Sequence, residues 1–228
     1  MSAAPLLQEL FPNIQDWGEL GQACADTLLM LGGSLALTVL IGLPLGVLLY
    51  LTGPGQLRAR PRTYAITSVV VNILRSVPFI ILMIVMMPVT YALVGTKLGV
   101  RGAIPPLVIG TAPFFARLVE TSLREVSRGV IEAAQAMGAS TWQIVRHVLL
   151  PEARAGIWAG ITVTAIALVG YTAMGGAIGS GGLGDLAYRY GYLSYKSDYM
   201  LVTVVLLVIL VQVLQVAGDR IVARYKQR

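Results

Sequence analysis

The residue types that build metal centres and disulfides are nearly absent from this chain of 228 residues. Cys24 is the single cysteine, which excludes a disulfide within the chain and a metal cage made of thiolates. His147 is the single histidine, so a zinc site with two histidines is excluded too. We expect His147 to be an ordinary polar residue of a helix, and the sequence predicts no metal site.

Sequence patterns that bind nucleotides or couple transport to ions are also missing. No GxxxxGK[S/T] loop occurs, so the chain has no phosphate-binding loop of that kind for ATP. The letters GSGGLG at 179–184 match the dinucleotide fingerprint, but they follow an apolar run instead of a strand, so we expect a turn with close backbone contacts. No Asp or Glu lies in the middle of an apolar run, which argues against a carrier driven by protons or sodium ions. No cofactor is predicted.

Long apolar runs dominate what remains. Hydrophobic residues make up 56% of the chain and charged residues 12%, against about a quarter charged in an average soluble domain, and the mean hydropathy is +0.76. Runs of this kind can cross about 30 Å of hydrocarbon as helices. The sequence therefore predicts an all-α membrane protein with five transmembrane helices, at about 27–51, 64–94 (kinked at Pro78), 102–119, 155–178 and 199–218.

The positions of lysine and arginine predict the orientation in the bilayer. Twelve of the 17 lie after the first span, from Arg117 to Arg154, or after the last span. Because cytoplasmic segments carry the excess of positive charge, we expect the N-terminus outside and the C-terminus in the cytoplasm. The predicted parts are an external segment 1–26, a transmembrane domain 27–222 and a basic cytoplasmic tail 223–228. The net charge of +6 then reflects topology, and no nucleic-acid partner is predicted.

The cytoplasmic segment 120–154 is longer than a connector needs, and its pattern predicts two helices. Residues 122–137 are expected to continue the third span, and Gly138 to end that helix with a positive φ or a close contact. Ser140 and Gln143 form a capping box for a second helix, which we expect Pro151 to end. Its apolar stripe consists of Ile144, Val145, Val148 and Leu149. Two short helices joined at a glycine predict a rigid knob that docks into a cleft of a cytoplasmic partner.

With this spacing, the segment EAAQAMGASTWQIVRHVLLP resembles the signature loop of bacterial ABC importer permeases of the type I fold. The resemblance implies a coupling helix that fits a groove of a separate ATPase chain, so that the permease itself is not an enzyme. It further implies a homodimer in the bacterial inner membrane, with two ATP-binding subunits and a periplasmic or lipid-anchored substrate-binding protein. The residues at the signature positions, expected to couple to the ATPase, are Glu132, Ala133, Ala134, Gly138, Val148, Leu150 and Pro151.

A narrower resemblance concerns the substrate. The stretches 72–90 and 170–192 are similar to the membrane subunits of methionine importers, which implies translocation of methionine by alternating access. A permease for another amino acid or small solute is one alternative, and a stand-alone channel is another.

Three residues are candidates for the translocation path. Tyr171 and Met174 could line it near a two-fold axis, with plain core packing as the alternative. Arg75 is the one charge inside an apolar run, and exposure to lipid would cost a few kcal/mol. We expect it to face protein or water, paired with a carbonyl or with Glu120; snorkelling to the interface is the alternative.

Overall fold

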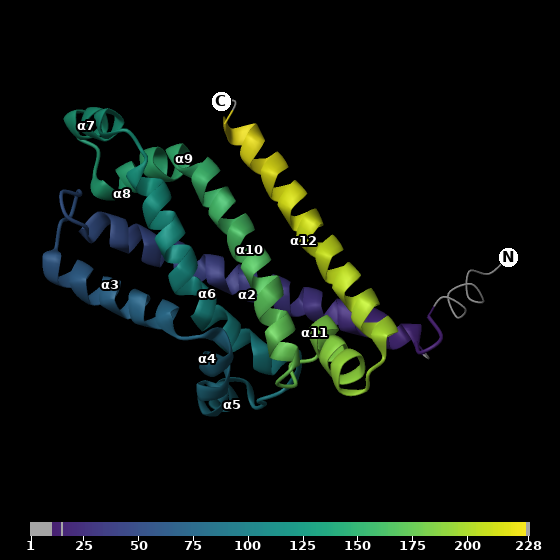
Figure 1. Cartoon of the computed structure of the whole chain (residues 1–228). Coiled ribbons are helices and arrows are strands. Elements are labelled where there is room, and N and C mark those ends of the chain that lie inside the picture. The colour runs from purple at the N-terminus through teal and green to yellow at the C-terminus, as the bar shows by residue number, and fades with distance from the viewer. Residues whose placement is uncertain (1–10, 15, 227–228) are drawn as a thin grey trace. The chain divides into compact units, whose positions relative to one another are not determined.

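The computed structural model describes residues 11–14 and 16–226, and the regular structure in this part of the chain is helical throughout (Figure 1). The chain divides into two compact units, and four long helices contribute to both of them. These helices are α2 (Trp17–Thr52), α6 (Gly99–Arg124), α10 (Arg154–Gly176) and α12 (Ser197–Lys226).

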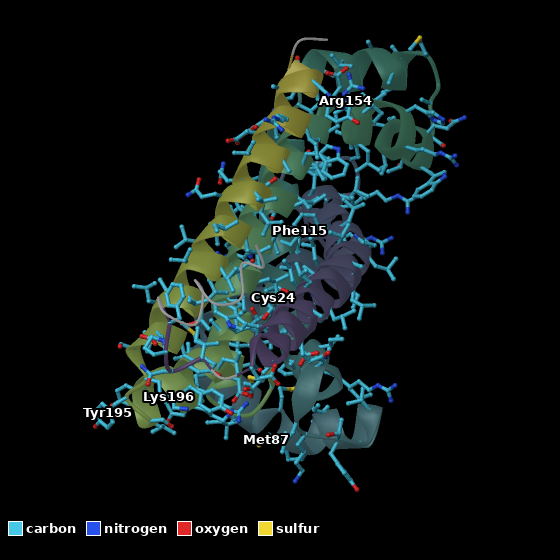
Figure 2. The ribbon with its side chains drawn as sticks, turned by 90° about the vertical axis from the view of Figure 1, so that its right-hand side faces the viewer. Cys24, Met87, Phe115, Arg154, Tyr195 and Lys196 are labelled. Atoms are coloured by element: carbon cyan, nitrogen blue, oxygen red, sulfur yellow. The ribbon has the colours of Figure 1, made fainter. Side chains whose placement is uncertain are left out.

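Unit 1 consists of the chain up to Ser34, Phe79–Leu107 and Ile166–Val213. Besides parts of the long helices it holds α4 (Phe79–Val85), α5 (Met87–Val94), α11 (Gly182–Leu186) and a π-helical turn at Ala187–Leu193. Its core includes Ile14, Leu20, Leu183, Leu186 and Tyr199. Tyr195, which follows the π-helical turn, is the one described non-glycine residue with positive φ (54°), and its side chain projects away from the ribbon (Figure 2).

The GSGGLG run lies in unit 1 and forms the predicted turn. A β-carbon on Gly184 would overlap the backbone of Ala173, and one on Gly176 would overlap the backbone at Gly184 and Asp185. The Leu183 amide donates to the Thr27 hydroxyl at 2.9 Å. The prediction of close backbone contacts is therefore confirmed, because the run packs α11 directly against α10.

Unit 2 consists of Leu35–Pro78, Val108–Ala165 and the chain from Leu214. It holds α3 (Pro61–Ser76), α7 (Arg128–Ala136), α8 (Thr141–Ile144), a π-helical turn at Val145–Leu149 and α9 (Leu150–Glu152). Gly42 and Gly46 of α2 let α6 approach closely, since a β-carbon on Gly46 would lie 2.6 Å from the Ala116 carbonyl oxygen. One buried cluster joins the ends of α2 and α6 to the segment between α6 and α10, and includes Tyr50, Phe115, Leu123, Ile131, Ile144 and Leu149.

Among the described residues, four helices are long and apolar enough to cross a membrane, and α3 with α4 makes a fifth if the pair is one broken span. The all-α class is confirmed, but the predicted second span, 64–94, is not one helix. α3 ends at Ser76, and Val77 is extended with φ −77° and ψ 124°. A residue before proline avoids the helical region, so Pro78 breaks the helix instead of kinking it.

The helix ends also differ from the predicted spans. α2 begins at Trp17, within the segment predicted to be external, and α6 is longer than 102–119 at both ends. α12 extends through most of the predicted tail 223–228, of which the last two residues lie outside the described part, as do residues 1–10. Apolar periodicity stops where the bilayer stops, whereas a helix continues as long as its backbone hydrogen bonds can form.

Candidate functional site

The segment between α6 and α10 begins with α7, which has a buried and an exposed side. Ile131 and Ala134 are buried against the cluster described above, whereas Glu132 and Ala133 are exposed. α6 ends at Arg124 and α7 starts at Arg128, so the prediction of one continuous helix over 122–137 is wrong. The break lets α7 change direction and present Glu132 and Ala133 on the surface.

Gly138 forms the predicted turn after α7, with φ +80°. Its amide donates to the Gln135 carbonyl at 2.9 Å, and the Ala139 amide donates to the Ala134 carbonyl at 3.1 Å. These two hydrogen bonds are those of a Schellman motif, in which glycine is favoured because its φ is positive. A β-carbon at Gly138 would meet no atom within 4 Å, so the backbone angle and not a close contact requires glycine here.

The second helix opens with the predicted capping box. The Ser140 amide donates to Gln143 Oε1 at 2.8 Å, and the Gln143 amide donates to Ser140 Oγ at 3.4 Å. The predicted stripe is also confirmed, because Ile144, Val145 and Leu149 are buried. Val148 is half-buried.

Pro151 does not end this helix, contrary to prediction. It lies within α9, and the chain passes into α10 after Ala153. Proline has no amide hydrogen, and its ring clashes with the carbonyl four residues earlier. The π-helical turn at Val145–Leu149, in which the Leu150 amide donates to the Val145 carbonyl, widens the helix before the proline and accommodates it.

Exposed apolar side chains surround the signature residues, and the sequence reading missed them. Met137 is 82% exposed and Trp142 68% exposed, and Val130 is exposed as well. The sequence did contain an indication that these side chains are exposed, because they lie in a polar, helix-forming segment but outside its predicted buried stripe. Trp and Met are enriched in the buried centres of protein interfaces. Leu150 is half-buried and Pro151 exposed.

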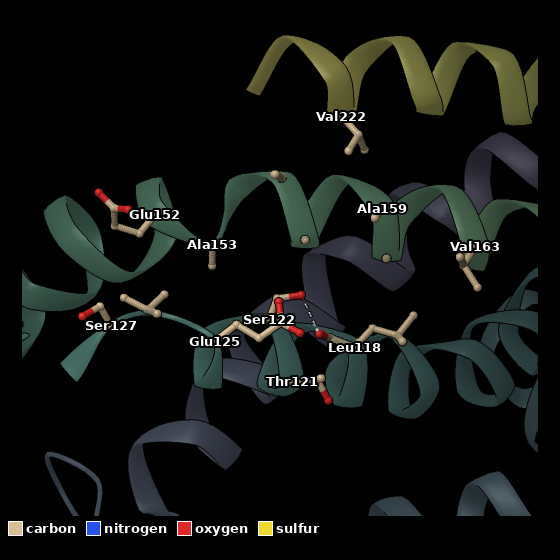
Figure 3. Close-up of a pocket in the computed structure, with 14 residues that line it drawn as sticks. Leu118, Thr121, Ser122, Glu125, Ser127, Glu152, Ala153, Ala159, Val163 and Val222 are labelled. Atoms are coloured by element: carbon tan, nitrogen blue, oxygen red, sulfur yellow. Dashed lines mark hydrogen bonds between the residues drawn. The ribbon is translucent and has the colours of Figure 1, made fainter. Parts of the chain in front are cut away.

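A cavity of about 590 Å³ lies where the segment leaves α6 and enters α10 (Figure 3). Glu125 and Ser127 line it before α7, and Glu152 lines it at the end of α9. The two helices touch beside it, since a β-carbon on Gly156 would lie 2.6 Å from Ser122 Oγ. Both ends of the segment therefore lie close together, beside the contact between α6 and α10.

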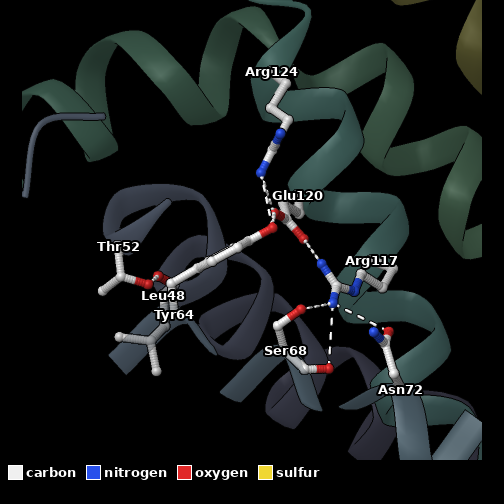
Figure 4. Close-up of polar contacts among 8 residues, drawn as sticks. All are labelled: Leu48, Thr52, Tyr64, Ser68, Asn72, Arg117, Glu120 and Arg124. Atoms are coloured by element: carbon white, nitrogen blue, oxygen red, sulfur yellow. Dashed lines mark hydrogen bonds and ion pairs between the residues drawn. The ribbon is translucent and has the colours of Figure 1, made fainter. Parts of the chain in front are cut away.

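A buried carboxylate joins α6 to α3 in unit 2 (Figure 4). Glu120 is 3% exposed, and its Oε2 accepts from Arg117 Nη1 at 2.6 Å. Its Oε1 accepts from Arg124 Nη2 at 2.7 Å and from the Tyr64 hydroxyl at 3.3 Å. Both oxygens of Glu120 are thus occupied, and the predicted alternative partner of Arg75 is engaged by two other arginines.

Arg117 extends this network along α3. Its Nη2 donates to Asn72 Oδ1 at 3.1 Å and to the hydroxyl of Ser68. The sequence reading assigned Arg117 to the cytoplasmic positive charge and missed the network, because residues 45 to 56 positions apart have to meet for it to form.

The three predicted path residues lie in different surroundings. Arg75 has an exposed side chain whose guanidinium carbon lies 5.8 Å from the centre of the Phe114 ring. Tyr171 is half-buried and stacks on Phe79, with ring centres 4.4 Å apart and planes 7° apart. Met174, one turn further along α10, is 50% exposed.

No group of three metal-ligating His, Cys, Asp or Glu side chains occurs among the residues that the structure describes. Cys24 is a half-buried free thiol.

The structure combines helices that are long and apolar enough to span a membrane with an exposed knob of two short helices between α6 and α10. A family model described as binding-protein-dependent transport system inner membrane component matches residues 42–228. The chain belongs to this family. Its knob is the segment that resembles the family's signature loop.

Individual relatives are similar over nearly the whole permease. The methionine import system permease protein MetP of Bacillus subtilis (strain 168) is 50% identical over 216 residues, which cover 95% of this chain and 97% of MetP. The probable D-methionine transport system permease protein MetI of Vibrio cholerae is 47% identical over 224 residues, covering 96% and 99%. An inward-facing structure of the MetNI methionine ABC transporter superposes with a TM-score of 0.90 at 52% identity, covering 92% of this chain and 97% of that one. The permease has the type I ABC importer fold.

Proposed function

We propose that this permease is the membrane subunit of an ATP-driven importer of methionine in a bacterial inner membrane. The observation that carries the proposal is the knob, which combines the signature spacing with a Schellman turn and a capping box. Similarity to methionine permeases over almost the full length supports the cargo. The permease lacks a phosphate-binding loop, so ATP is hydrolysed by a partner.

The assembly comprises two copies of the permease, two ATPase subunits on the cytoplasmic face and a substrate-binding protein outside. The N-terminus faces outward and the C-terminus inward, in line with the positive charge of the segments around the knob. The knob docks into the ATPase through its exposed side. Met137 and Trp142 supply apolar contacts there, and Glu132 and Ala133 supply the signature surface.

The residues assigned to the path are those expected from the sequence, Arg75, Tyr171 and Met174. Closure of the ATPases on ATP moves the knobs, and the knobs move α6 and α10, to which both of their ends are attached. The movement opens the path outward, where the substrate-binding protein releases its cargo. Hydrolysis then returns the permease to the inward-facing state.

The first test is import of labelled methionine into proteoliposomes that contain the permease with its ATPase and binding protein. We expect uptake that requires ATP and is competed by unlabelled methionine. Uptake of a different solute with no uptake of methionine would leave the ATP-driven permease in place and exclude the cargo.

The second test separates coupling from folding at Gly138. Gly138→Val places a β-branched side chain at φ +80°, a strain of about 1 to 2 kcal/mol, whereas Gly138→Asn tolerates this angle. We expect both variants to reach the membrane, and methionine-stimulated ATP hydrolysis to fall about tenfold only in the valine variant. Loss of the valine variant from the membrane would assign Gly138 to folding, and full coupling in both would refute a mechanical role of the turn.

A further inference from the structure

Arg75 lies in the last turn of α3, inside a run of apolar residues. It is 13 residues after Arg62, which corresponds to about 20 Å along a helix, in a layer of hydrocarbon about 30 Å thick. Its side chain is exposed, and no ion pair to it occurs in the part of the chain that the structure describes. The distance from the basic end of α3 is too long for the side chain to reach that interface by snorkelling.

A second donor lies one turn away on the same face of α3. Asn72 is exposed, and its Oδ1 accepts from Arg117 Nη2 at 3.1 Å. This hydrogen bond holds the amide oxygen toward Arg117, so the amide nitrogen faces away from it with two N–H donors. Residues three apart on a helix are neighbours, so the Asn72 amide and the Arg75 guanidinium form one donor surface.

The charge balance around this surface is positive. Glu120 is the carboxylate of the neighbouring network, and both of its oxygens are already bonded to Arg117 and Arg124. Phe114 lies under the Arg75 guanidinium and limits where it can point. A guanidinium over an aromatic ring and beside an amide donor, with no carboxylate paired to it among the described residues, fits a carboxylate from outside the protein.

We propose that Arg75 and Asn72 bind the α-carboxylate of the amino-acid substrate during its passage, with Arg117 as the positioning residue for Asn72. This assignment rests on the proposed function, in which the cargo is a zwitterion that must lose part of its water shell inside the bundle. The contact is made by two side chains from one helix, so it is weak enough to release the substrate, as a transport path requires. A lipid phosphate is the competing source of an anion.

Access of water to this surface is tested first, with thiol chemistry. The single native cysteine allows a cysteine-free background, Cys24→Ser, in which Ser76→Cys places a thiol beside Arg75 and Val70→Cys places one on a different side of the same helix. The probes are anionic sulfonatoethyl and cationic trimethylammonioethyl methanethiosulfonate, applied to the purified complex in phosphatidylcholine nanodiscs.

We expect the thiol at position 76 to react about tenfold faster with the anionic than with the cationic reagent, because the two charges interact with Arg75 with opposite sign. The preference should vanish with Arg75→Gln and remain with Arg75→Lys. The thiol at position 70 should react with neither reagent. No reaction at position 76, or a preference that does not depend on Arg75, would overturn the proposal.

The ligand is tested by protection of the thiol at position 76. Methionine should slow its modification, whereas methionine amide, which lacks the carboxylate, should not; with Asn72→Leu the protection by methionine should weaken. Equal protection by both compounds, or protection that appears only when phosphatidylglycerol is added to the nanodiscs, would exclude a substrate carboxylate. Protection by another amino acid but not by methionine would retain the carboxylate site and refute the cargo of the proposed function.

Discussion

The two units of the permease hold their helices together by different chemistry. In unit 2 the contacts are polar and specific: Glu120 binds two arginines, and the hydroxyls of Thr38 and Thr111 are 2.6 Å apart in a buried hydrogen bond between α2 and α6. Glycine backbones make close contacts in both units, whereas unit 1 has stacked rings and its ion pairs belong to the half-exposed Arg189. Three buried hydroxyls there, on Ser34, Thr90 and Ser180, have no hydrogen-bond partner within the described part of the chain.

We relate this difference to the role of each unit in the proposed transport cycle. A buried ion network is stable in one geometry, because a shift of any member leaves a charge unpaired. The network therefore fixes α3 to α6 beside the knob, to which the proposed function assigns the transmission of force. Contacts of glycine backbones and of stacked rings lose less free energy when helices shift slightly. They suit a unit whose helices change position in the proposed transport cycle. Three substitutions test this contrast.

The largest effect is expected for Glu120→Gln in unit 2. The substitution leaves Arg117 and Arg124 without their counter-charge. Because Arg124 is 44% exposed, water partly solvates its charge and reduces the cost. We expect a loss of about 3 kcal/mol in the free energy of unfolding. The matched control is Asp185→Asn in unit 1, which removes the nearer of the two carboxylates beside the half-exposed Arg189 and should cost less than about 1 kcal/mol. Thermal unfolding of the purified complex measures both, and similar losses would contradict the contrast.

An intermediate effect is expected for Gly184→Ala in unit 1. The new methyl group would overlap the Ala173 backbone, and separating α11 from α10 should cost about 1 to 3 kcal/mol. Gly170→Ala, in the same unit, meets no atom within 4 Å and should be neutral or slightly stabilising, because alanine favours helix. If both variants unfold at the temperature of the wild type, the close backbone contacts do not hold unit 1 together.

The smallest effect is expected for Tyr195→Gly. Tyr195 has φ 54° and is 91% exposed, so glycine relieves backbone strain without removing a packed ring. The gain should be at most about 1 kcal/mol, which the same unfolding measurement can detect as a small rise in the transition temperature. A clear loss of stability would mean that the exposed ring packs against something in the assembled importer.

Sequence alone determined the local features of this permease. Apolar run length predicted the long helices, and the spacing of Gly138, Ser140 and Gln143 predicted the turn and the capping box, because each of these depends on residues a few positions apart. The same locality explains the confirmed buried stripe at Ile144, Val145 and Leu149.

Only the tertiary structure decided the rest. Pro78 marked a kink in the sequence, but the structure decided that α3 ends at Ser76 and that Val77 is extended. The π-helical turn before Pro151 depends on how the wider helix packs, and the network around Glu120 needs α3 beside α6. Exposure of Met137 and Trp142 was decided by which side of the knob the core covers. A sequence fixes what each short stretch prefers, whereas pairings across 45 or more residues depend on how the helices pack in three dimensions.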